Sequence, residues 1–375
     1  MIRVLQLAHV INRQDFIDNI VRHADRSMFE IDVCTRARVA NIAEPIYDTT
    51  VRHHRILDEQ HGRLATMAQL ARLLRVGHYD VLHAHHFDQA LLGAITVGLS
   101  PRTKLVIGRH YSDSMYALPP LKRHAYLALE ALINRRADAI AVPSTMIRDL
   151  LVQRQGVDPE KVVHVPYAFD PAKYHPVPLE RVAAIRAELS IEGRLAIGAF
   201  GRLFSAKGLE VLLRAFAHVH RAHTEVRLVL VGDGPQRAEL EALAIALDVK
   251  DAVRFAGWRT DAMSVMSAVD VVAHASYTEA FSQVMVEALL LEKPLVITDV
   301  SGVRDLLQDR ISARIVPVRD QAALTAALDE IVSDAVVRSA MAVRGAAVAR
   351  AHLLAPEAVR PMELLYRHVV ASKAS

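Results

Sequence analysis

The fold is decided first by the stretch Leu195-Ala196-Ile197-Gly198-Ala199-Phe200-Gly201-Arg202-Leu203-Phe204-Ser205-Ala206-Lys207-Gly208-Leu209. Its apolar first part predicts a buried strand that ends at Phe200, and the periodic pattern of a helix begins near Leu209. Strands that alternate with helices in this way form parallel sheets, because the helix carries the chain back across the face of the sheet. The stretch therefore predicts an α/β protein.

The same alternation extends over most of the 375 residues. In the first half, strands are predicted at Ile2–Leu7, Glu30–Thr35, Asp80–His83, Lys104–Arg109, Asp138–Val142 and Lys161–Val165. In the second half, they are predicted at Leu195–Phe200, Val226–Val231, Val253–Ala256, Val269–His274, Pro294–Thr298 and Ala313–Val316. Helical patterns lie between them, for example at Leu64–Val76, Leu121–Arg136, Leu209–His220 and Pro235–Leu247.

A linker separates the two runs of alternation. Asp170–Pro178 holds three prolines in nine residues, and the strand–helix pattern restarts after it. We therefore expect two tandem, doubly wound, Rossmann-like domains, at residues 1–172 and 173–355. The helical segment 356–375 is expected to pack back on the first domain. The carboxyl edges of the two sheets would face each other across a cleft, where such sheets bind ligands.

Composition narrows the class of protein. Hydrophobic residues make up 52% and charged residues 23% of the chain, which suits large buried cores. No stretch approaches the about 18 apolar residues of a membrane-spanning helix, and the first residues lack the apolar run of a signal peptide. Cys34 is the only cysteine, so we expect a cytoplasmic protein without an internal disulfide. A net charge of +3 without a basic run argues against a nucleic-acid partner.

Two turns have the chemistry of an anion site. Gly201 lets a ligand approach the backbone, and Arg202 and Lys207 supply cations beside the start of a helix. A turn whose two basic residues only face water would have the same sequence. The second turn, Gly232-Asp233-Gly234-Pro235, also joins a buried strand to a helix start. Its glycines serve the fold whichever ligand binds.

A third segment, Ser276–Glu287, carries two carboxylates. Glu279 follows a predicted strand, and Glu287 lies two turns into the next helix. Carboxylates at such a helix start can accept hydrogen bonds from sugar hydroxyls without a metal. Two glutamates eight positions apart also occur by chance, so their context decides their meaning.

The order of these motifs supplies that context. The chain resembles the family-4 retaining glycosyltransferases of GT-B fold ("glycosyl transferases group 1" type). The resemblance rests on Gly201-Arg202 with Lys207-Gly208, Val231–Pro235, Phe255–Trp258 and Glu279 with Glu287, and it covers about residues 195–310. The segment Val165–Asp170 resembles the connection between the two domains of that family.

The resemblance implies a role for each matching residue. Arg202 and Lys207 would bind the donor diphosphate and stabilise it as leaving group, Glu279 would bind the hydroxyls of the donor sugar, and Glu287 the nucleotide ribose. The further positions that would contact the donor are Gly201, Gly257, Trp258 and Arg259 and the backbone of Ala280, Phe281 and Ser282. The implied donor is a UDP- or GDP-linked sugar, with neither a metal nor another cofactor required.

The chain departs from the family pattern in two places. Ala280 and Ser282 stand where the family often has glycines, so the choice of sugar could differ. The family's glycine-rich turn after the first strand is replaced by His9-Val10-Ile11-Asn12-Arg13-Gln14, which removes the basis for transferring contacts of that turn.

The first half is rich in histidine. His110 ends a predicted strand and resembles a family histidine that contacts the donor sugar near the reacting carbon; a packed or helix-capping histidine is the alternative. His83 and His85 share one face of a predicted strand. We expect packing or a place along the cleft for this His83–His86 cluster rather than zinc, because no cysteine or ordered carboxylate cluster accompanies it.

The implied function is the transfer of a hexose from a nucleotide-diphosphate sugar to a glycan or lipid-linked acceptor, in cell-envelope or exopolysaccharide biosynthesis. The basic-ended helical segment Leu121–Arg136 would either rest on the inner membrane or be an ordinary surface helix. Two other functions remain open. One is a nucleotide-sugar epimerase of the same fold, and the other is a non-catalytic subunit that binds sugar nucleotides.

Overall fold

The computed structural model describes residues 1–8, 15–35, 52–55, 62–111 and 114–372. Its internal contacts divide the chain into two compact units. The first unit comprises Met1–Asp170 and Leu353–Ser375, and the second comprises Pro171–His352. The first boundary falls at the start of the proline-rich linker, and the C-terminal helix belongs to the first unit.

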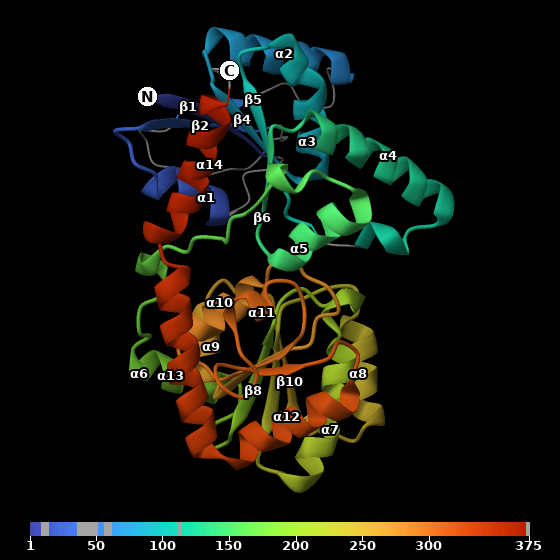
Figure 1. The fold of residues 1–375 in the computed structure, drawn as a ribbon. Helices are drawn as coiled ribbons and strands as arrows, with labels where there is room; N and C mark the ends of the chain where they lie inside the picture. Colours follow the sequence, from blue (N-terminus) through green and yellow to red (C-terminus); the bar gives the residue numbers. More distant parts are fainter. Residues whose placement is uncertain (9–14, 36–51, 56–61, 112–113, 373–375) are drawn as a thin grey trace. The chain divides into compact units, whose positions relative to one another are not determined.

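The first unit is a seven-stranded parallel sheet with helices on both faces (Figure 1). Its strand order is β3-β2-β1-β4-β5-β6-β7. The strands are β1 (Ile2–Ala8), β2 (Phe29–Thr35), β3 (His53–Arg55), β4 (Val81–His85), β5 (Lys104–Gly108), β6 (Ala139–Val142) and β7 (Val162–His164). The helices are α1 (Asp15–His23), α2 (Gly62–Val76), α3 (His86–Thr96), α4 (Pro120–Arg136), α5 (Thr145–Asp149) and α14 (Arg360–Ala371).

The C-terminal helix α14 completes the core of the first unit. Met362, Leu365, Tyr366 and Val369 pack with α1 against strands from the first 170 residues. Because these side chains recur every three or four residues, they form one apolar stripe that must be covered. A segment far away in sequence thus closes one face of this sheet.

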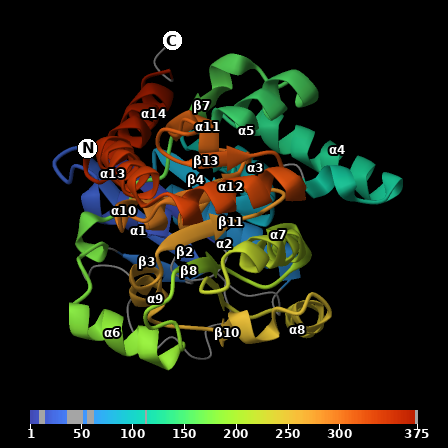
Figure 2. The ribbon, with the colours of Figure 1, turned by 90° about the horizontal axis from the view of Figure 1, so that it is seen from below.

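The second unit is a six-stranded parallel sheet in the order β10-β9-β8-β11-β12-β13. Its strands are β8 (Ala196–Phe200), β9 (Arg227–Val231), β10 (Val253–Gly257), β11 (Val271–His274), β12 (Leu295–Thr298) and β13 (Arg314–Val316). Its helices are α6 (Leu179–Glu188), α7 (Leu209–Ala222), α8 (Arg237–Ala246), α9 (Ala262–Ala268), α10 (Gln283–Leu290), α11 (Val303–Leu306), α12 (Gln321–Ser333) and α13 (Ala335–His352). Helices α7, α8 and α12 cover one face, and α9 and α10 the other (Figures 1 and 2).

The predicted strands are confirmed, with ends that shift by one or two residues. The short strand β3 was not predicted, because the three residues His53-His54-Arg55 carry no apolar pattern. Tertiary pairing with β2 makes them a strand. The prediction of two Rossmann-like α/β domains is therefore correct.

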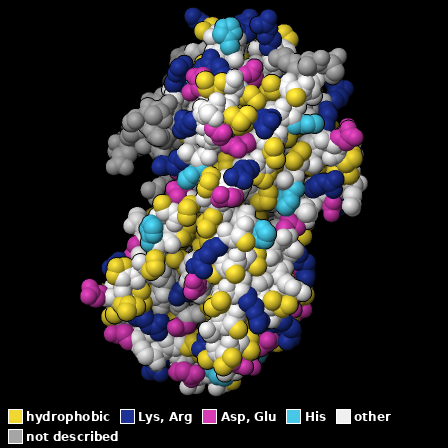
Figure 3. All heavy atoms as spheres, turned by 60° about the vertical axis from the view of Figure 1, so that its left-hand side comes forward, with side chains coloured by type: hydrophobic (Ala, Val, Ile, Leu, Met, Phe, Trp, Pro, Cys, Tyr) yellow, Lys and Arg dark blue, Asp and Glu magenta, His cyan; other side chains and the backbone are white. Residues whose placement is uncertain are grey.

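None of the described helices combines the length and the hydropathy of a membrane-spanning segment. On the face drawn in Figure 3, the Lys and Arg side chains are interspersed with Asp and Glu.

Candidate functional site

The candidate site of the second unit lies where its strand order reverses. β8 is paired with β9 on one side and with β11 on the other, and the helices that follow these strands leave in opposite directions. The chain therefore leaves β8 and β11 toward opposite faces of the sheet at this edge, which is where doubly wound sheets bind ligands, and we refer to this edge as the crevice. The loops after these two strands contain Gly201–Gly208 and Ala275–Ser282.

Glycines allow three loops to meet at this edge. Gly201 N donates to Val231 O over 2.9 Å, and Gly232 N donates to Gly257 O over 2.8 Å. Gly232 has a φ of +135°, and a Cβ there would lie 2.0 Å from Gly201 O. Only glycine fits such a backbone contact. The glycines predicted from the turn pattern thus hold the loops after β8, β9 and β10 together.

A second backbone contact brings Lys207 to Glu279. Gly208 has a φ of +59°, and a Cβ at this position would lie 2.2 Å from Ala275 O. Tyr277 N also donates to Ala206 O over 2.8 Å. The loop after β8 therefore lies directly against the loop after β11, and Lys207 Nζ is 2.5 Å from Glu279 Oε1.

Glu279 is an ionised carboxylate with most of its surface buried. Its Oε1 accepts hydrogen bonds from Lys207, from Ser276 Oγ over 2.7 Å and from His274 Nε2 over 3.1 Å. Burial raises the pKa of Glu279, but the hydrogen bond from His274 and the charge of Lys207 outweigh it and bring the pKa to about 2. The Glu279 carboxylate can therefore only accept hydrogen bonds, and three donors fix its orientation.

The start of α10 faces the same crevice. Ser282 is the N-cap of this helix, and its Oγ accepts from Met285 N over 3.1 Å. A Cβ at residue 302 would lie 2.6 Å from the ring of Phe281, so the lack of a side chain at Gly302 leaves room for this ring. Ala280 O accepts from Ser301 Oγ over 3.0 Å, which anchors the loop. Backbone N–H groups and the positive end of the α10 dipole lie at this terminus.

Glu287 sits in the second turn of α10 and is half-buried. It is thus on the same helix as the N-terminus that faces the crevice. Helical geometry places it about 6 to 8 Å further along the helix axis than Ser282. It remains a candidate for contact with the part of a ligand that lies away from the diphosphate.

Arg202 and Trp258 project into solvent at this edge. Arg202 is exposed, its guanidinium carbon is 4.5 Å from the centre of the Phe204 ring, and among the described residues it forms no ion pair. The Trp258 side chain is 79% exposed. Both are available for a ligand.

Arg259 differs from these two, because its guanidinium is already engaged. It forms ion pairs with Glu188 and with Asp261, the latter at 2.7 Å, and these carboxylates raise its pKa. A donor near Arg259 would therefore meet a guanidinium that two carboxylates already hold in place. Its place in a donor site stays a prediction.

In the first unit, a chain of hydrogen bonds fixes His110. Tyr167 Oη lies 2.6 Å from His110 Nδ1, and His110 Nε2 lies 2.9 Å from His85 Nδ1. His85 Nε2 lies 2.7 Å from Gln6 Oε1, which can only accept, so His85 carries its proton on Nε2. Burial lowers the pKa of His85 and of His110 far below the ordinary value, so both rings are neutral. His110 therefore donates through Nε2 and accepts the Tyr167 hydroxyl at Nδ1.

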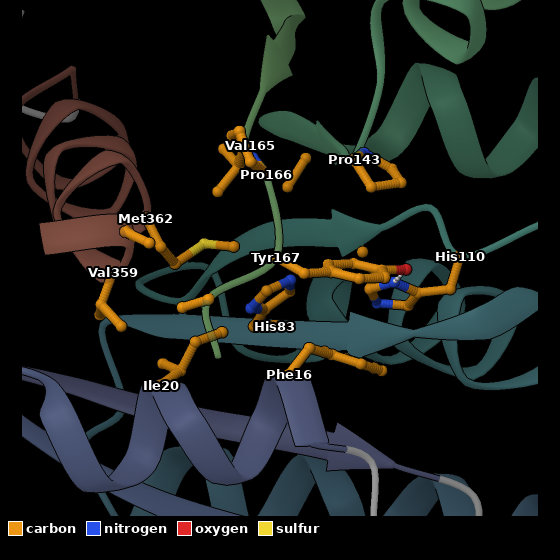
Figure 4. Close-up of a pocket in the computed structure, with 14 residues that line it drawn as sticks. Phe16, Ile20, His83, His110, Pro143, Val165, Pro166, Tyr167, Val359 and Met362 are labelled. Carbon is orange, nitrogen blue, oxygen red and sulfur yellow. Dashed lines mark hydrogen bonds between the residues drawn. The ribbon is translucent and has the colours of Figure 1, made fainter. Parts of the chain in front are cut away.

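The chain continues from Gln6 to the C-terminal helix. Gln6 Nε2 donates to Tyr366 Oη over 2.8 Å, and Tyr366 donates to His83 Nδ1 over 2.7 Å. His83 Nε2 is buried and has no hydrogen-bond partner among the described residues. His83 borders a cavity whose lining is mostly apolar and includes residues of α1, of the segment after β7 and of α14 with the turn before it, as well as the ends of β5 and β6 (Figure 4).

The histidine cluster thus has a place in the fold. His83 and His85 share one face of β4, as predicted, with ring centres 4.0 Å apart. Within the described ranges, no three His, Cys, Asp or Glu side chains are arranged to hold a metal ion. Both ring nitrogens of His110 are hydrogen-bonded, so contact with a donor through either nitrogen requires a bond to open. The donor-contacting role of His110 stays a prediction.

Several residues of these two clusters were missed at the sequence level. His274 and Gln6 carry no motif, since each is a single polar residue in an apolar strand, and no role was assigned to Tyr167 within Val165–Asp170 or to Tyr366. One signal could have found His274 and Gln6: a polar side chain inside a buried parallel strand needs a partner. The segment His9–Gln14, which replaces the family's glycine-rich turn, lies outside the described residues.

Comparison with known proteins matches almost the whole chain. The family model "Glycosyltransferase Family 4" matches residues 15–173, and the model "Glycosyl transferases group 1" matches residues 182–361. The D-inositol 3-phosphate glycosyltransferase of Salinispora tropica is 27% identical over 365 residues, which cover 88% of this chain and 75% of that protein. The lipopolysaccharide core biosynthesis glycosyltransferase LpsE of Rhizobium meliloti is 33% identical over 165 residues, 44% of this chain and 47% of LpsE.

The fold of this chain is also similar to that of solved structures. The crystal structure of HepE of Anabaena in complex with UDP has a TM-score of 0.83 to this chain at 21% identity, and the match covers 98% of this chain and 100% of HepE. HepE was also solved with UDP-glucose. The strand orders, the glycine-held crevice and the two family matches lead to one conclusion: this chain belongs to the family-4 glycosyltransferases, of GT-B fold.

Proposed function

We propose that this protein is a retaining glycosyltransferase that moves a hexose from a UDP- or GDP-linked donor to a glycan or lipid-linked acceptor, without a metal ion. The observation that carries the proposal is the crevice of the second unit, where Lys207, Glu279 and the N-terminus of α10 meet. A cation, a carboxylate and a helix N-terminus at one sheet edge match the diphosphate and hydroxyls of a nucleotide sugar.

The diphosphate would be bound by Arg202, Lys207 and the N–H groups at the start of α10. Two guanidinium or ammonium groups and a helix dipole can supply the positive charge that a metal supplies at other diphosphate sites. Glu287 would accept from the ribose, and Gly257, Trp258 and Arg259 would lie near the base. Gly201 supports the approach of the phosphates, because a Cβ there would meet only Lys207 Cε, at 3.7 Å.

In the proposed reaction, the bond between the anomeric carbon and the diphosphate oxygen breaks. The acceptor oxygen forms its bond to the same face of that carbon, and the acceptor proton passes to the leaving diphosphate. Glu279 is not the nucleophile in this scheme, because three donors hold its Oε1 and its proposed task is to accept from sugar hydroxyls. This differs from retaining glycosidases, where a carboxylate attacks.

The relatives support a donor and an acceptor class. HepE was solved with UDP-glucose, which supports a UDP-linked donor. LpsE acts in lipopolysaccharide core biosynthesis, which supports an acceptor of the cell envelope. Ala280 and Ser282, in place of family glycines, would narrow the space around the sugar.

A peripheral contact with the inner membrane belongs to the same proposal. The outer face of α4 and the turn before it expose Leu118, Leu121 and Leu129, of which Leu121 is 84% exposed. Exposed basic residues, Lys122 and Arg135, accompany them. Apolar side chains flanked by cations favour an anionic lipid surface.

The test is an assay of purified protein with a panel of UDP- and GDP-hexoses, with and without lipid-linked oligosaccharide acceptors. We expect an acceptor-dependent release of nucleoside diphosphate and a product with the anomeric configuration of the donor, as determined by NMR. An isomerised donor without acceptor would indicate an epimerase. Tight donor binding without any conversion would indicate a binding subunit. An inverted product would contradict the retaining mechanism.

A further inference from the structure

His274 connects the two polar groups of the crevice. It ends β11 and its side chain is only 3% exposed. Its Nε2 lies 3.1 Å from Glu279 Oε1 and 3.2 Å from Ser282 Oγ, the N-cap of α10. One ring nitrogen is therefore shared between the carboxylate after β11 and the first residue before the helix.

The proton on this nitrogen can be assigned. Glu279 is ionised, because its pKa is about 2, and an ionised carboxylate can only accept. His274 Nε2 must therefore carry a hydrogen that points between Glu279 and Ser282. Ser282 Oγ also accepts from Met285 N, so both of its acceptor sites are used by the protein. Its own hydroxyl hydrogen then has no acceptor among the described residues.

The three donors to Glu279 all bind the same oxygen. Lys207, Ser276 and His274 reach Oε1 at 2.5, 2.7 and 3.1 Å, and within the described residues no hydrogen bond reaches Oε2. The carboxylate therefore cannot rotate without losing three bonds. In this orientation Oε2 is the oxygen left for a ligand.

We infer that His274 is a positioning residue, which locks Glu279 and the N-cap Ser282 together so that Oε2 of Glu279 is presented to the donor. The inference rests on the proposed function. It assigns Oε2 to a hydroxyl of the sugar. An aliphatic side chain at residue 274 would fill the strand end but leave both groups without their shared donor.

The proposed role of His274 requires its N–H donor rather than its volume, so matched substitutions can separate these two properties. His274→Leu keeps the size and removes the hydrogen, whereas His274→Gln keeps an N–H donor of similar reach. Ser276→Ala removes a second donor to the same oxygen without touching the strand, and serves if His274→Leu does not fold. The Leu variant should bind UDP as the wild type does and bind the UDP-hexose about tenfold more weakly, and the Gln variant should restore binding.

A second readout does not depend on donor chemistry. Carbon-detected NMR of labelled glutamate follows the titration of the Glu279 carboxyl, identified by its loss in Glu279→Gln. Its pKa should rise by about 1 in His274→Leu and return toward the wild-type value in His274→Gln. An unchanged Glu279 titration in His274→Leu would overturn the inference even if transfer activity is found. A raised pKa in a protein that binds no nucleotide sugar would leave the His274–Glu279 link standing and remove the proposed function instead.

Discussion

Lys207 Nζ and Glu279 Oε1 lie 2.5 Å apart although 72 residues separate them in the chain. The ion pair exists because Gly208 lets the loop after β8 rest on the backbone of Ala275. Both side chains are more than three-quarters buried, so water screens their attraction less than at a surface. The proposed phosphate-binding and sugar-binding groups of the site are thus coupled, and a change in one should alter the other.

Lys207→Met tests this coupling. The variant loses the cation proposed for the diphosphate and one of three donors to Glu279, so kcat/KM for transfer should fall at least about 100-fold. Steady-state kinetics with the preferred donor measures it. Arg350→Met is the matched control, because Arg350 pairs with Glu292 at the surface, past the C-terminal end of α10 and away from the crevice. Equal activity of Lys207→Met and Arg350→Met would contradict the site.

Gly232→Ala should destabilise the second unit. The added Cβ would lie 2.0 Å from Gly201 O, at a φ of +135° that side chains rarely adopt. We expect a loss of about 2 to 4 kcal/mol in the free energy of unfolding, measured with denaturant. Gly193→Ala has a φ of +61° and no atom within 4 Å, so strain alone should cost about 1 kcal/mol. Similar losses in both variants would show that the contact of the two loops is unimportant.

The ionised state of Glu279 makes a prediction about pH. The pKa of this carboxyl falls from 4.5 in the unfolded chain to about 2 in the folded protein. Its contribution to stability is therefore present above pH 4.5 and is lost as the pH falls toward 2. Unfolding curves of wild type and Glu279→Gln should differ by about 3 kcal/mol near neutral pH and converge in acid. A difference that stays constant between pH 6 and pH 3 would argue against this pKa.

Tyr366→Phe tests the hydrogen-bonded chain of the first unit. The change leaves the aromatic ring in the core but deprives Gln6 of its acceptor and His83 of its donor. Two buried groups without partners should cost about 2 to 4 kcal/mol of unfolding free energy. Tyr116→Phe is the control, because among the described residues the half-buried Tyr116 hydroxyl takes part in one long hydrogen bond, from Gln155 Nε2 at 3.5 Å. A loss no greater than in this control would mean that the chain of hydrogen bonds is not stabilising.

The strands and the crevice glycines were predictable because they depend on local patterns. A buried parallel strand is a continuous apolar run, and a turn with a positive φ favours glycine. The strand ends Phe200-Gly201 and Val231-Gly232 can therefore be recognised in the sequence. The short strand β3 was not predictable, since its pairing with β2 and not its composition defines it.

The polar clusters could be predicted only in part. Lys207, Glu279 and Ser282 were found through the order of motifs, whereas His274 was not, because its partners are fixed by loop packing rather than by spacing. Likewise, Tyr366 meets Gln6 and His83 only after α14 has packed on a sheet built from the other end of the chain. Such contacts depend on tertiary structure, which periodicity does not encode.

Titration calorimetry of UDP-glucose and related UDP- and GDP-hexoses into the wild type, Lys207→Met and Glu279→Gln tests the central claim most directly. We expect that at least one donor binds the wild type, that Lys207→Met weakens both donor and free nucleoside diphosphate, and that Glu279→Gln weakens the donor more than the free nucleoside diphosphate. Binding of a donor with equal affinity to all three proteins would contradict the claim that the crevice beside α10 is the donor site.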